Sequence, residues 1–330
     1  MNLKTISKKL NLDLQGDPSF EIDSLCSIDS PKKNSIVCVS KAKMLDENLL
    51  KNAGALLIDE NLFKTFAFPK SSNILISGNF KKSFAEIACF FKTTPSEPIS
   101  IKYRDIKNIP TNTDSLYIGK NINLGKNCHF GKNVVIHDNT HIGDNCYVGS
   151  NVVIHSNSII GNNVSIQDGC IIGSEGFGNT LSNNFEWIHI CHLGNVVISD
   201  YVSIGSNCCI DCATLDSTVI ESGVIIDNLV HIAHNVHIGE NTAIAAKTGI
   251  AGSCKIGKRN LIGGMVGIVD HIKTADDVII TATSTVYKDI DKPGTYTGIM
   301  PISEHVSWKR IAFWITKLDK ILKKLNIKKP

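Results

Sequence analysis

The middle of the chain repeats every six residues, and this repeat constrains the fold more than any other feature. Large apolar residues recur at strict six-residue spacing from Ile118 to Ile172, and Asn stands three residues after each of the first eight. Asn and Gly tolerate the left-handed backbone region that a sharp turn requires. One short strand and one turn in every six residues predict a parallel β-helix, whose coils stack at the sheet spacing of about 4.8 Å.

The repeat is interrupted once and slips once. It breaks at 174–195, returns at Ile198, slips after Ile210, and then runs unbroken from Ile220 to Ile268. The slot four residues after each apolar residue holds small or β-branched side chains, several of them Cys. We interpret these cysteines as compact apolar filler of the solenoid core.

The regions on either side of the repeat differ from it. Residues 1–100 mix helical stretches with short apolar runs, which predicts a small α/β domain, and Pro95, Pro98 and Pro110 mark the linker that follows. The β-helix is expected over 101–301, and a basic C-terminal helix with a net charge of +6 over 302–330.

The last helix carries a heptad pattern. Trp308, Ile315 and Leu322 are seven residues apart. The spacing fits association with another helix, or equally an amphipathic helix packed on its own subunit.

Charge and hydropathy exclude several classes of protein. The net charge of +3 is too small for a nucleic-acid-binding protein. The N-terminus lacks the apolar core of a signal peptide, and no run approaches the ~18 apolar residues of a membrane span. We expect a cytoplasmic protein without nucleic-acid partners. That location argues against disulfides among the 11 cysteines, and Cys209-x-x-Cys212 has no second pair at zinc spacing.

The hexads resemble those of the left-handed hexapeptide-repeat acyltransferases. The resemblance implies a mainly β fold, a left-handed parallel β-helix with three hexads in each coil of 18 residues. On such a coil Gly252 lies one coil above His234, and His271 lies two coils and one residue above it. This column offers a base, a backbone N–H free of side-chain obstruction and a second imidazole. Acyl transfer needs a general base and a donor to the developing oxyanion.

The histidines also allow other interpretations. Of the 11, His137, His155 and His237 are expected only to occupy exposed slots. His231, His234 and His237 could hold zinc between subunits, as in trimeric hexapeptide-repeat carbonic anhydrases. Hexad geometry places His231 and His237 on different faces of one subunit, which disfavours that interpretation. No metal site is therefore expected.

Several motifs make the resemblance specific. The motifs are Gly173-Ser-Glu-Gly-Phe-Gly178, Trp187, Ile210-Asp-x-x-x-Leu215-Asp-x-Thr218 and Asp227-Asn-Leu-Val-x-Ile-Ala-His-Asn235. They resemble those of the UDP-3-O-(3-hydroxyacyl)glucosamine N-acyltransferases of lipid A biosynthesis, as does the order of α/β domain, β-helix and helical tail.

The resemblance implies a role for each matching residue. His234 would take a proton from the glucosamine 2-amino group as it attacks an acyl thioester. Asp227 would orient that base, and the N–H of Gly252 would bind the oxyanion. His271 would contact the acylated sugar, with Asn235 as a further contact.

The same resemblance implies the partners. The acyl chain arrives on the phosphopantetheine arm of acyl carrier protein, the acceptor is UDP-3-O-acylglucosamine, and the subunits form a homotrimer. No metal or diffusible cofactor is needed. The basic tail should attract the acidic carrier protein, unless it is only a solvated helix face.

A column of small residues suggests an acyl groove. Gly249, Gly267 and Thr285 are 18 residues apart and should stack on one outward slot. In the resembling family a methionine that limits chain length stands at the position of Thr285, so we expect longer hydroxyacyl chains here. The alternative is that the glycines only serve turn geometry.

Some positions depart from the family pattern. Cys38 and Met44 replace the aromatic residues of its uridine site, and neither can stack a base. Cys191 replaces a proline and Cys212 an arginine. A specialised paralogue, a transferase acting on another nucleotide sugar or using coenzyme A, and a non-catalytic hexapeptide scaffold therefore stay open.

Overall fold

The computed structural model describes residues 1–93, 99–101, 116–182, 184–298 and 302–324. The linker marked by Pro95, Pro98 and Pro110 lies outside the described residues. The chain divides into two compact units, Met1–Thr297 and Gly298–Pro330. The predicted α/β domain and β-helix therefore belong to one unit, and the predicted tail forms the other.

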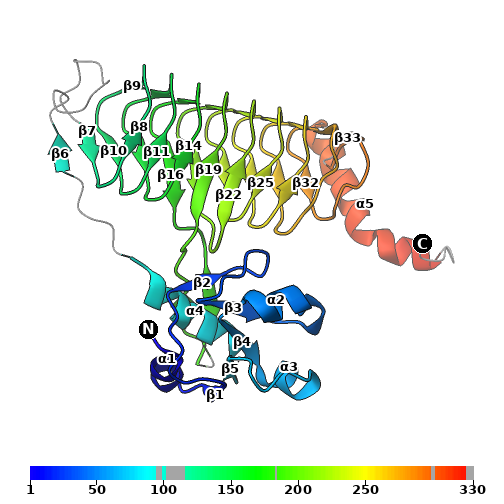
Figure 1. The fold of residues 1–330 in the computed structure, drawn as a ribbon. Coiled ribbons are helices and arrows are strands. Elements are labelled where there is room, and N and C mark those ends of the chain that lie inside the picture. Colours follow the sequence, from blue (N-terminus) through cyan, green and yellow to red (C-terminus); the bar gives the residue numbers. More distant parts are fainter. Residues whose placement is uncertain (94–98, 102–115, 183, 299–301, 325–330) are drawn as a thin grey trace. The chain divides into compact units, whose positions relative to one another are not determined.

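The first part of the larger unit is an α/β domain (Figure 1). Its five-stranded sheet has the order β1-β5-β4-β3-β2, with β1 antiparallel to β5 and the other pairs parallel. The helical stretches and apolar runs expected from the sequence appear as predicted. Its elements are α1 (Leu3–Leu10), β1 (Asp13–Gln15), β2 (Ser24–Cys26), β3 (Ser35–Val39), η1 (Ala42–Met44), α2 (Glu47–Asn52), β4 (Ala55–Asp59), α3 (Glu60–Thr65), β5 (Ile74–Ser77) and α4 (Phe80–Phe91).

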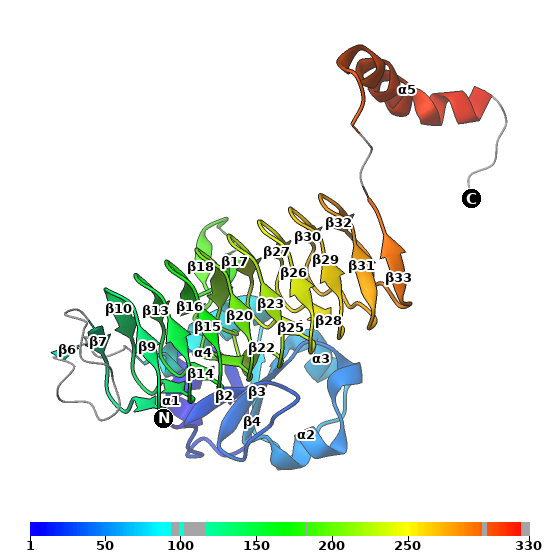
Figure 2. The same cartoon turned by 90° about the horizontal axis from the view of Figure 1, so that it is seen from above.

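The hexads fold into a parallel β-solenoid, as the period predicts (Figure 2), and it has three sheets, as the resemblance implies. The ten-stranded sheet contains β6 (Ile99–Ile101), β7 (Leu116–Ile118), β10 (Val134–Ile136), β13 (Val153–Ile154), β16 (Ile171–Ser174), β21 (Cys209–Asp211), β24 (His231–Ile232), β27 (Gly249–Ile250), β30 (Gly267–Ile268) and β32 (Thr285–Val286). The antiparallel β6–β7 pair is its one exception to parallel pairing.

The other two sheets complete each coil. The seven-stranded sheet contains β8 (Asn123–Leu124), β11 (His141–Ile142), β14 (Ile159–Ile160), β19 (Asn195–Ile198), β22 (Ser217–Ile220), β25 (His237–Ile238) and β28 (Lys255–Ile256). The nine-stranded sheet contains β9 (His129–Phe130), β12 (Tyr147–Val148), β15 (Ser165–Ile166), β20 (Ser203–Ile204), β23 (Ile225–Ile226), β26 (Ala243–Ile244), β29 (Leu261–Ile262), β31 (Val278–Ile280) and β33 (Gly294–Tyr296).

The turns explain why Asn recurs. The asparagines at the turn slot, every sixth residue from Asn121 to Asn163, all have φ between 55° and 64°. Their side chains also bond from coil to coil, as from Asn121 Nδ2 to Asn139 Oδ1 at 3.0 Å. Inside the coils the hexad isoleucines and the cysteines form one buried core. Each fully buried aliphatic side chain of this kind stabilises the fold by about 1.5–3 kcal/mol.

Both irregularities of the repeat leave the solenoid at the same corner. One follows β16 and contains the antiparallel hairpin of β17 (Asn179–Leu181) and β18 (Trp187–His189), and the other follows the adjacent strand β21. Cys191, Leu193 and Leu215 from these insertions pack against the core of the α/β domain. The strand above β21 is β24, which ends beside His234, so both insertions reach the candidate site.

The smaller unit contains α5 (His305–Lys324), which confirms the predicted tail helix. No helix among the residues described here is long and apolar enough to cross a membrane.

Candidate active site

The turns that follow the ten-stranded sheet bring the predicted column together. His234 follows β24, Gly252 follows β27, and His271 follows β30. The N–H of Ser253 donates to His234 O and the N–H of His271 donates to Gly252 O, both at 3.0 Å. Because these bonds join successive coils, the column is part of the regular ladder of the solenoid.

The Asn235 side chain fixes the tautomer of His234. Asn235 Nδ2 donates to Leu215 O at 2.8 Å, and Asn235 Oδ1 accepts from the N–H of Thr214 at 2.9 Å. The same Oδ1 lies 3.1 Å from His234 Nδ1. Since this oxygen can only accept, Nδ1 carries the proton and Nε2 keeps a free lone pair. Asn235, expected to contact substrate, therefore orients the imidazole.

The free nitrogen of His234 lies over Gly252. A Cβ built on Gly252 would come within 2.7 Å of His234 Nε2, so the position requires glycine. In comparable turns, the equivalent N–H is capped by a side chain of the next coil, as Lys120 N is by Asp138 Oδ1 at 2.7 Å. Within the described residues, the N–H of Gly252 has no acceptor. A polarised oxygen of a ligand can therefore accept a hydrogen bond from this N–H.

Six of the eight predicted site residues line one pocket of about 730 Å³. They are His234, Gly249, Gly252, Gly267, His271 and Thr285. A Cβ on Gly249 would meet nothing within 4 Å, and one on Gly267 would meet Thr285 Cγ2 at 3.8 Å. Since β27, β30 and β32 are paired in register, the two glycines leave an open strip that ends at Thr285.

Within one chain Asp227 does not reach His234, so its expected orienting role stays a prediction. It follows β23 in the nine-stranded sheet, a different face from that of β24. Its carboxylate accepts from the N–H of Asn228 at 2.7 Å and from the N–H of Ala246 at 3.2 Å. The carboxylate beside the His234 corner is instead Asp211, which ends β21 and is 5% exposed.

Asp211 and His192 converge with His234 around one glycine. A Cβ on Gly176 would lie 3.1 Å from Asp211 Oδ2, 3.1 Å from His192 Nε2 and 3.2 Å from His234 Cβ. Burial raises the pKa of Asp211, although Ser174 Oγ donates to its Oδ1 at 2.9 Å. The site thus contains a buried carboxyl group that sequence reasoning missed, although Asp211 lies within a quoted motif.

His192 packs edge-on against the base. The two ring centroids are 5.3 Å apart with an interplanar angle of 75°. Burial, reinforced by the neighbouring His234, lowers the pKa of His192 to about 4. Its Nδ1 lies 3.1 Å from Ile190 O, so Nδ1 carries the proton. The ring is therefore neutral and places no positive charge beside His234.

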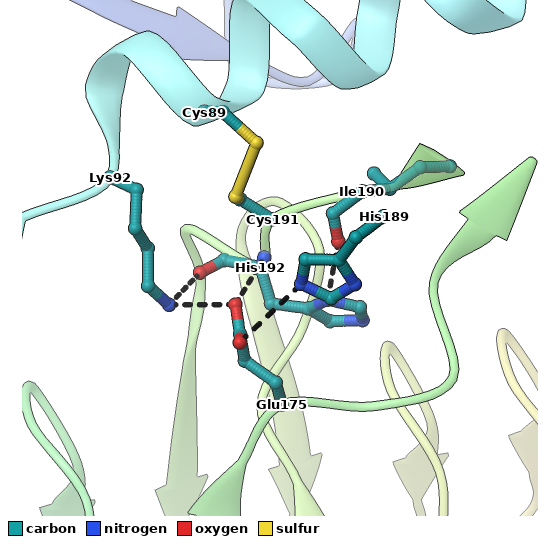
Figure 3. The surroundings of a disulfide bond; sticks show 7 residues. All are labelled: Cys89, Lys92, Glu175, His189, Ile190, Cys191 and His192. Atoms are coloured by element: carbon teal, nitrogen blue, oxygen red, sulfur yellow. Dashed lines mark hydrogen bonds and ion pairs between the residues drawn. A yellow bond between two sulfur atoms is a disulfide. The ribbon is translucent and has the colours of Figure 1, made fainter. Parts of the chain in front are cut away.

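A cross-domain clamp holds the His192 loop (Figure 3). Lys92 Nζ, just beyond α4, donates to Glu175 Oε1 at 2.9 Å and to His192 O at 2.8 Å. The N–H of His192 donates to the same Glu175 oxygen at 3.1 Å. A disulfide joins Cys89 of α4 to Cys191, across 102 residues of chain.

That disulfide corrects the expectation that the cysteines stay unpaired. The repeat places neither Cys89 nor Cys191 in the solenoid core, and spacing alone could not show that α4 meets the hairpin loop. The zinc set of His231, His234 and His237 is disfavoured as expected, because β24 and β25 belong to different sheets. His237 Nε2 is instead 2.7 Å from Glu221 Oε1.

The two residues that differ from the uridine site of the resembling family both lie in the α/β domain. Cys38 is in β3, and Met44 ends η1 with 39% of its surface exposed. Neither side chain can stack a base, because neither is aromatic. Uridine binding by the α/β domain stays a prediction.

Comparisons with known proteins agree with this geometry. Residues 121–156 and 217–252 match the bacterial transferase hexapeptide family (six repeats). A solved UDP-N-acetylglucosamine acyltransferase from Francisella novicida covers 60% of this chain and 71% of its own, at 22% identity and a TM-score of 0.50. That likeness concerns the fold alone.

Sequence relatives extend the match to the full chain. A UDP-3-O-acylglucosamine N-acyltransferase from Delftia acidovorans is 36% identical over 150 residues, which span 46% of this chain and 44% of the relative. A protein of the same name from Vesicomyosocius okutanii subsp. Calyptogena okutanii is 40% identical over 330 residues, 99% of this chain and 97% of the relative. The chain therefore belongs to the UDP-3-O-acylglucosamine N-acyltransferase family.

Proposed function

We propose that the chain transfers a 3-hydroxyacyl group from acyl carrier protein to the 2-amino group of UDP-3-O-acylglucosamine, a step of lipid A biosynthesis. The observation that carries the proposal is the free Nε2 of His234 over the unpaired N–H of Gly252. A base and an oxyanion donor lie side by side in a pocket of about 730 Å³ that also contains the open strip of Gly249 and Gly267. A non-catalytic scaffold would not need this arrangement.

The chemistry follows from these two groups. The sugar nitrogen attacks the carbonyl carbon of the thioester while His234 Nε2 takes a proton from that nitrogen. The carbonyl oxygen of the thioester gains a negative charge. The N–H of Gly252 donates to this oxygen and stabilises the tetrahedral intermediate. As the C–S bond breaks, the imidazolium gives its proton to the leaving sulfur. The protein's own side chains move the protons, without a diffusible cofactor.

The base is tested by substitution. His234→Ala should lower kcat by about 10²–10⁴-fold, the usual contribution of a general base. His141→Ala, an exposed histidine of β11 in the seven-stranded sheet, is the matched control and should keep its activity. The assay incubates UDP-3-O-acylglucosamine with 3-hydroxyacyl carrier protein and detects the product by mass spectrometry. Near-normal turnover by His234→Ala would refute the assignment.

We further propose a homotrimer formed through the nine-stranded sheet. Ile225, Leu261 and Ile279 on its outward slots are 40–55% exposed and line an apolar groove of about 510 Å³. Asp227 lines the same groove. An orienting role for Asp227 therefore requires a second copy of the chain, which sedimentation of the wild type and of Leu261→Glu would test.

The remaining partner assignments are proposals of the same kind. The basic residues of 302–330 favour attraction to an acidic carrier protein, and exposed charges would make that attraction sensitive to salt. His271 lines the 730 Å³ pocket with His234 and is proposed to contact the acylated sugar. Gly249, Gly267 and Thr285, in that pocket too, are proposed to contact the acyl chain. A carrier-borne donor and a nucleotide-sugar acceptor favour a cytoplasmic location.

A further inference from the structure

Three side chains of different chemistry meet on the outward face below His234. Cys209 and Asp211 belong to β21 and His231 to β24, and Cys209 pairs with His231 in register. The sulfur, a carboxylate oxygen and a ring nitrogen all lie within 4.8 Å of one another. Asp211 Oδ2 is 3.6 Å from His231 Nε2, and Asp211 Oδ1 is 3.7 Å from Cys209 Sγ.

The imidazole is not in direct contact with the carboxylate. The 3.6 Å between Asp211 Oδ2 and His231 Nε2 is too long for a hydrogen bond, whereas Cys209 Sγ donates weakly to Asp211 Oδ1 at 3.7 Å. Ligand atoms around a tetrahedral zinc ion, with bonds of about 2.0–2.3 Å, lie roughly 3.3–3.7 Å apart. Both distances to the carboxylate fall in that range, and the three groups lie within 4.8 Å, so a small shift of the side chains would bring them around one ion.

The surroundings supply the support that metal ligands usually have. Asp211 is buried, and Ser174 Oγ donates to its Oδ1 at 2.9 Å, which fixes the carboxylate. His231, whose side chain is half-exposed, and the buried Asp211 both line the 730 Å³ pocket. The pocket leaves an open position for water and a path of entry for the ion.

We propose that Cys209, Asp211 and His231 form a binding site for Zn²⁺ on the wall of the active-site pocket. A thiolate, an imidazole and a carboxylate suit zinc, whereas Mg²⁺ and Ca²⁺ prefer oxygen ligands alone. On binding, the S–H bond of Cys209 is replaced by a bond from sulfur to the metal, and the proton leaves to solvent. The site does not depend on the proposed acyl transfer.

A second cluster in the described part of the chain provides the internal comparison. Glu175, His189 and Cys191 also lie close together. The Cys191 sulfur is bonded to Cys89, so it is not available as a thiolate while the disulfide is intact. His237 and Glu221 form an imidazole–carboxylate pair on another face, outside both clusters. His189→Gln and His237→Gln are therefore matched controls.

The test uses Co²⁺ alone as a spectroscopic probe for the zinc site. The full-length oxidised protein is freed of metal with a chelator and titrated without thiol reductant. We expect one equivalent of Co²⁺ to give a thiolate-to-cobalt charge-transfer band and four-coordinate visible bands, which Zn²⁺ then abolishes. Cys209→Ser should lose the charge-transfer band, and His231→Gln should weaken binding by at least about 10-fold. Both controls should titrate as the wild type does.

The possible outcomes separate clearly. The absence of a stoichiometric band in the wild type, or its persistence in Cys209→Ser, would overturn the proposal. Loss of the band in His189→Gln, with Cys209→Ser unaffected, would assign the metal to the other cluster and also overturn it. Circular dichroism and thermal melts identify any variant that fails to fold. Both substituted ligands are outward-facing residues of the sheet, so we expect both variants to fold.

Discussion

At the scale of single residues, the orientation of the base depends on an amide. Asn235 has a φ of 59°, as the turn requires, while its side chain joins His234 to the insertion after β21. One residue thus shapes the turn and sets the tautomer of the neighbouring imidazole.

Asn235→Ala should lower kcat by at least about 10-fold and leave KM nearly unchanged, because His234 loses the acceptor that fixes its tautomer. Asn235→Asp keeps an acceptor oxygen and should retain more activity. Asn241→Ala is the matched control, since Asn241 has a φ of 57° in a turn away from His234. Steady-state kinetics and thermal melts make the comparison. Equal losses in the two alanine variants would show that backbone strain, rather than the tautomer, is responsible.

His192 should make the stability of the protein depend on pH. Burial lowers its pKa to about 4, below the ordinary value of 6.5, so the unfolded state binds the proton first as the pH falls. The stabilisation is therefore present above pH 6.5 and is lost as the pH falls toward 4. Between pH 7 and pH 5 the wild type should lose about 2 kcal/mol more unfolding free energy than His192→Gln. Urea unfolding at both values measures this, and parallel curves would contradict it.

The sequence predicted how the site residues align along the coils, but not which side chains contact them. The six-residue period, with the three hexads per coil that the resemblance implies, placed His234, Gly252 and His271 in one column, because the alignment depends on the length of the coil. It could not place His192, Asp211 or Asn235 around His234. Their contacts depend on two insertions that leave the repeat and return to it.

At the scale of elements, β27, β30 and β32 set the length of the open strip in the pocket. Thr285→Met should fill the end of that strip and shift selectivity toward shorter hydroxyacyl chains, by about 0.8 kcal/mol for each CH₂ excluded. Competition between carrier proteins loaded with different chains measures the shift. Asn123→Met, on an outward slot of β8 in the seven-stranded sheet, is the control. An unchanged product ratio in Thr285→Met would show that the strip does not measure chain length.

The elements themselves were largely readable from the sequence. A six-residue period with Asn at the turns predicts a parallel β-helix. The apolar spacing from Phe80 to Phe91 predicts a helix, and α4 forms there. The antiparallel hairpin of β17 and β18 was not readable, because residues 174–195 contain neither the hexad nor another period.

At the scale of the larger unit, the disulfide joins the α/β domain to the solenoid. Cys89→Ser should lower the free energy of unfolding by roughly 2–5 kcal/mol, because the bond closes a loop of about 100 residues in the unfolded chain. Thermal melts of the wild type and the variant, with and without dithiothreitol, measure the effect. Cys38→Ser removes a half-buried thiol that is in no disulfide and is the control. If reductant leaves the wild-type melting temperature unchanged, the bond does not stabilise the fold.

The stacking of the coils has a consequence for where the molecule opens. Along the ladders of the three sheets each coil bonds to the coils on either side, so local unfolding of the solenoid should start at its first and last coils and move inward, as in a one-dimensional chain of coupled units. The turn that bears His234 is flanked in its sheet by β21 on one side and by β27, β30 and β32 on the other. The reacting groups therefore occupy interior coils, where fraying arrives last.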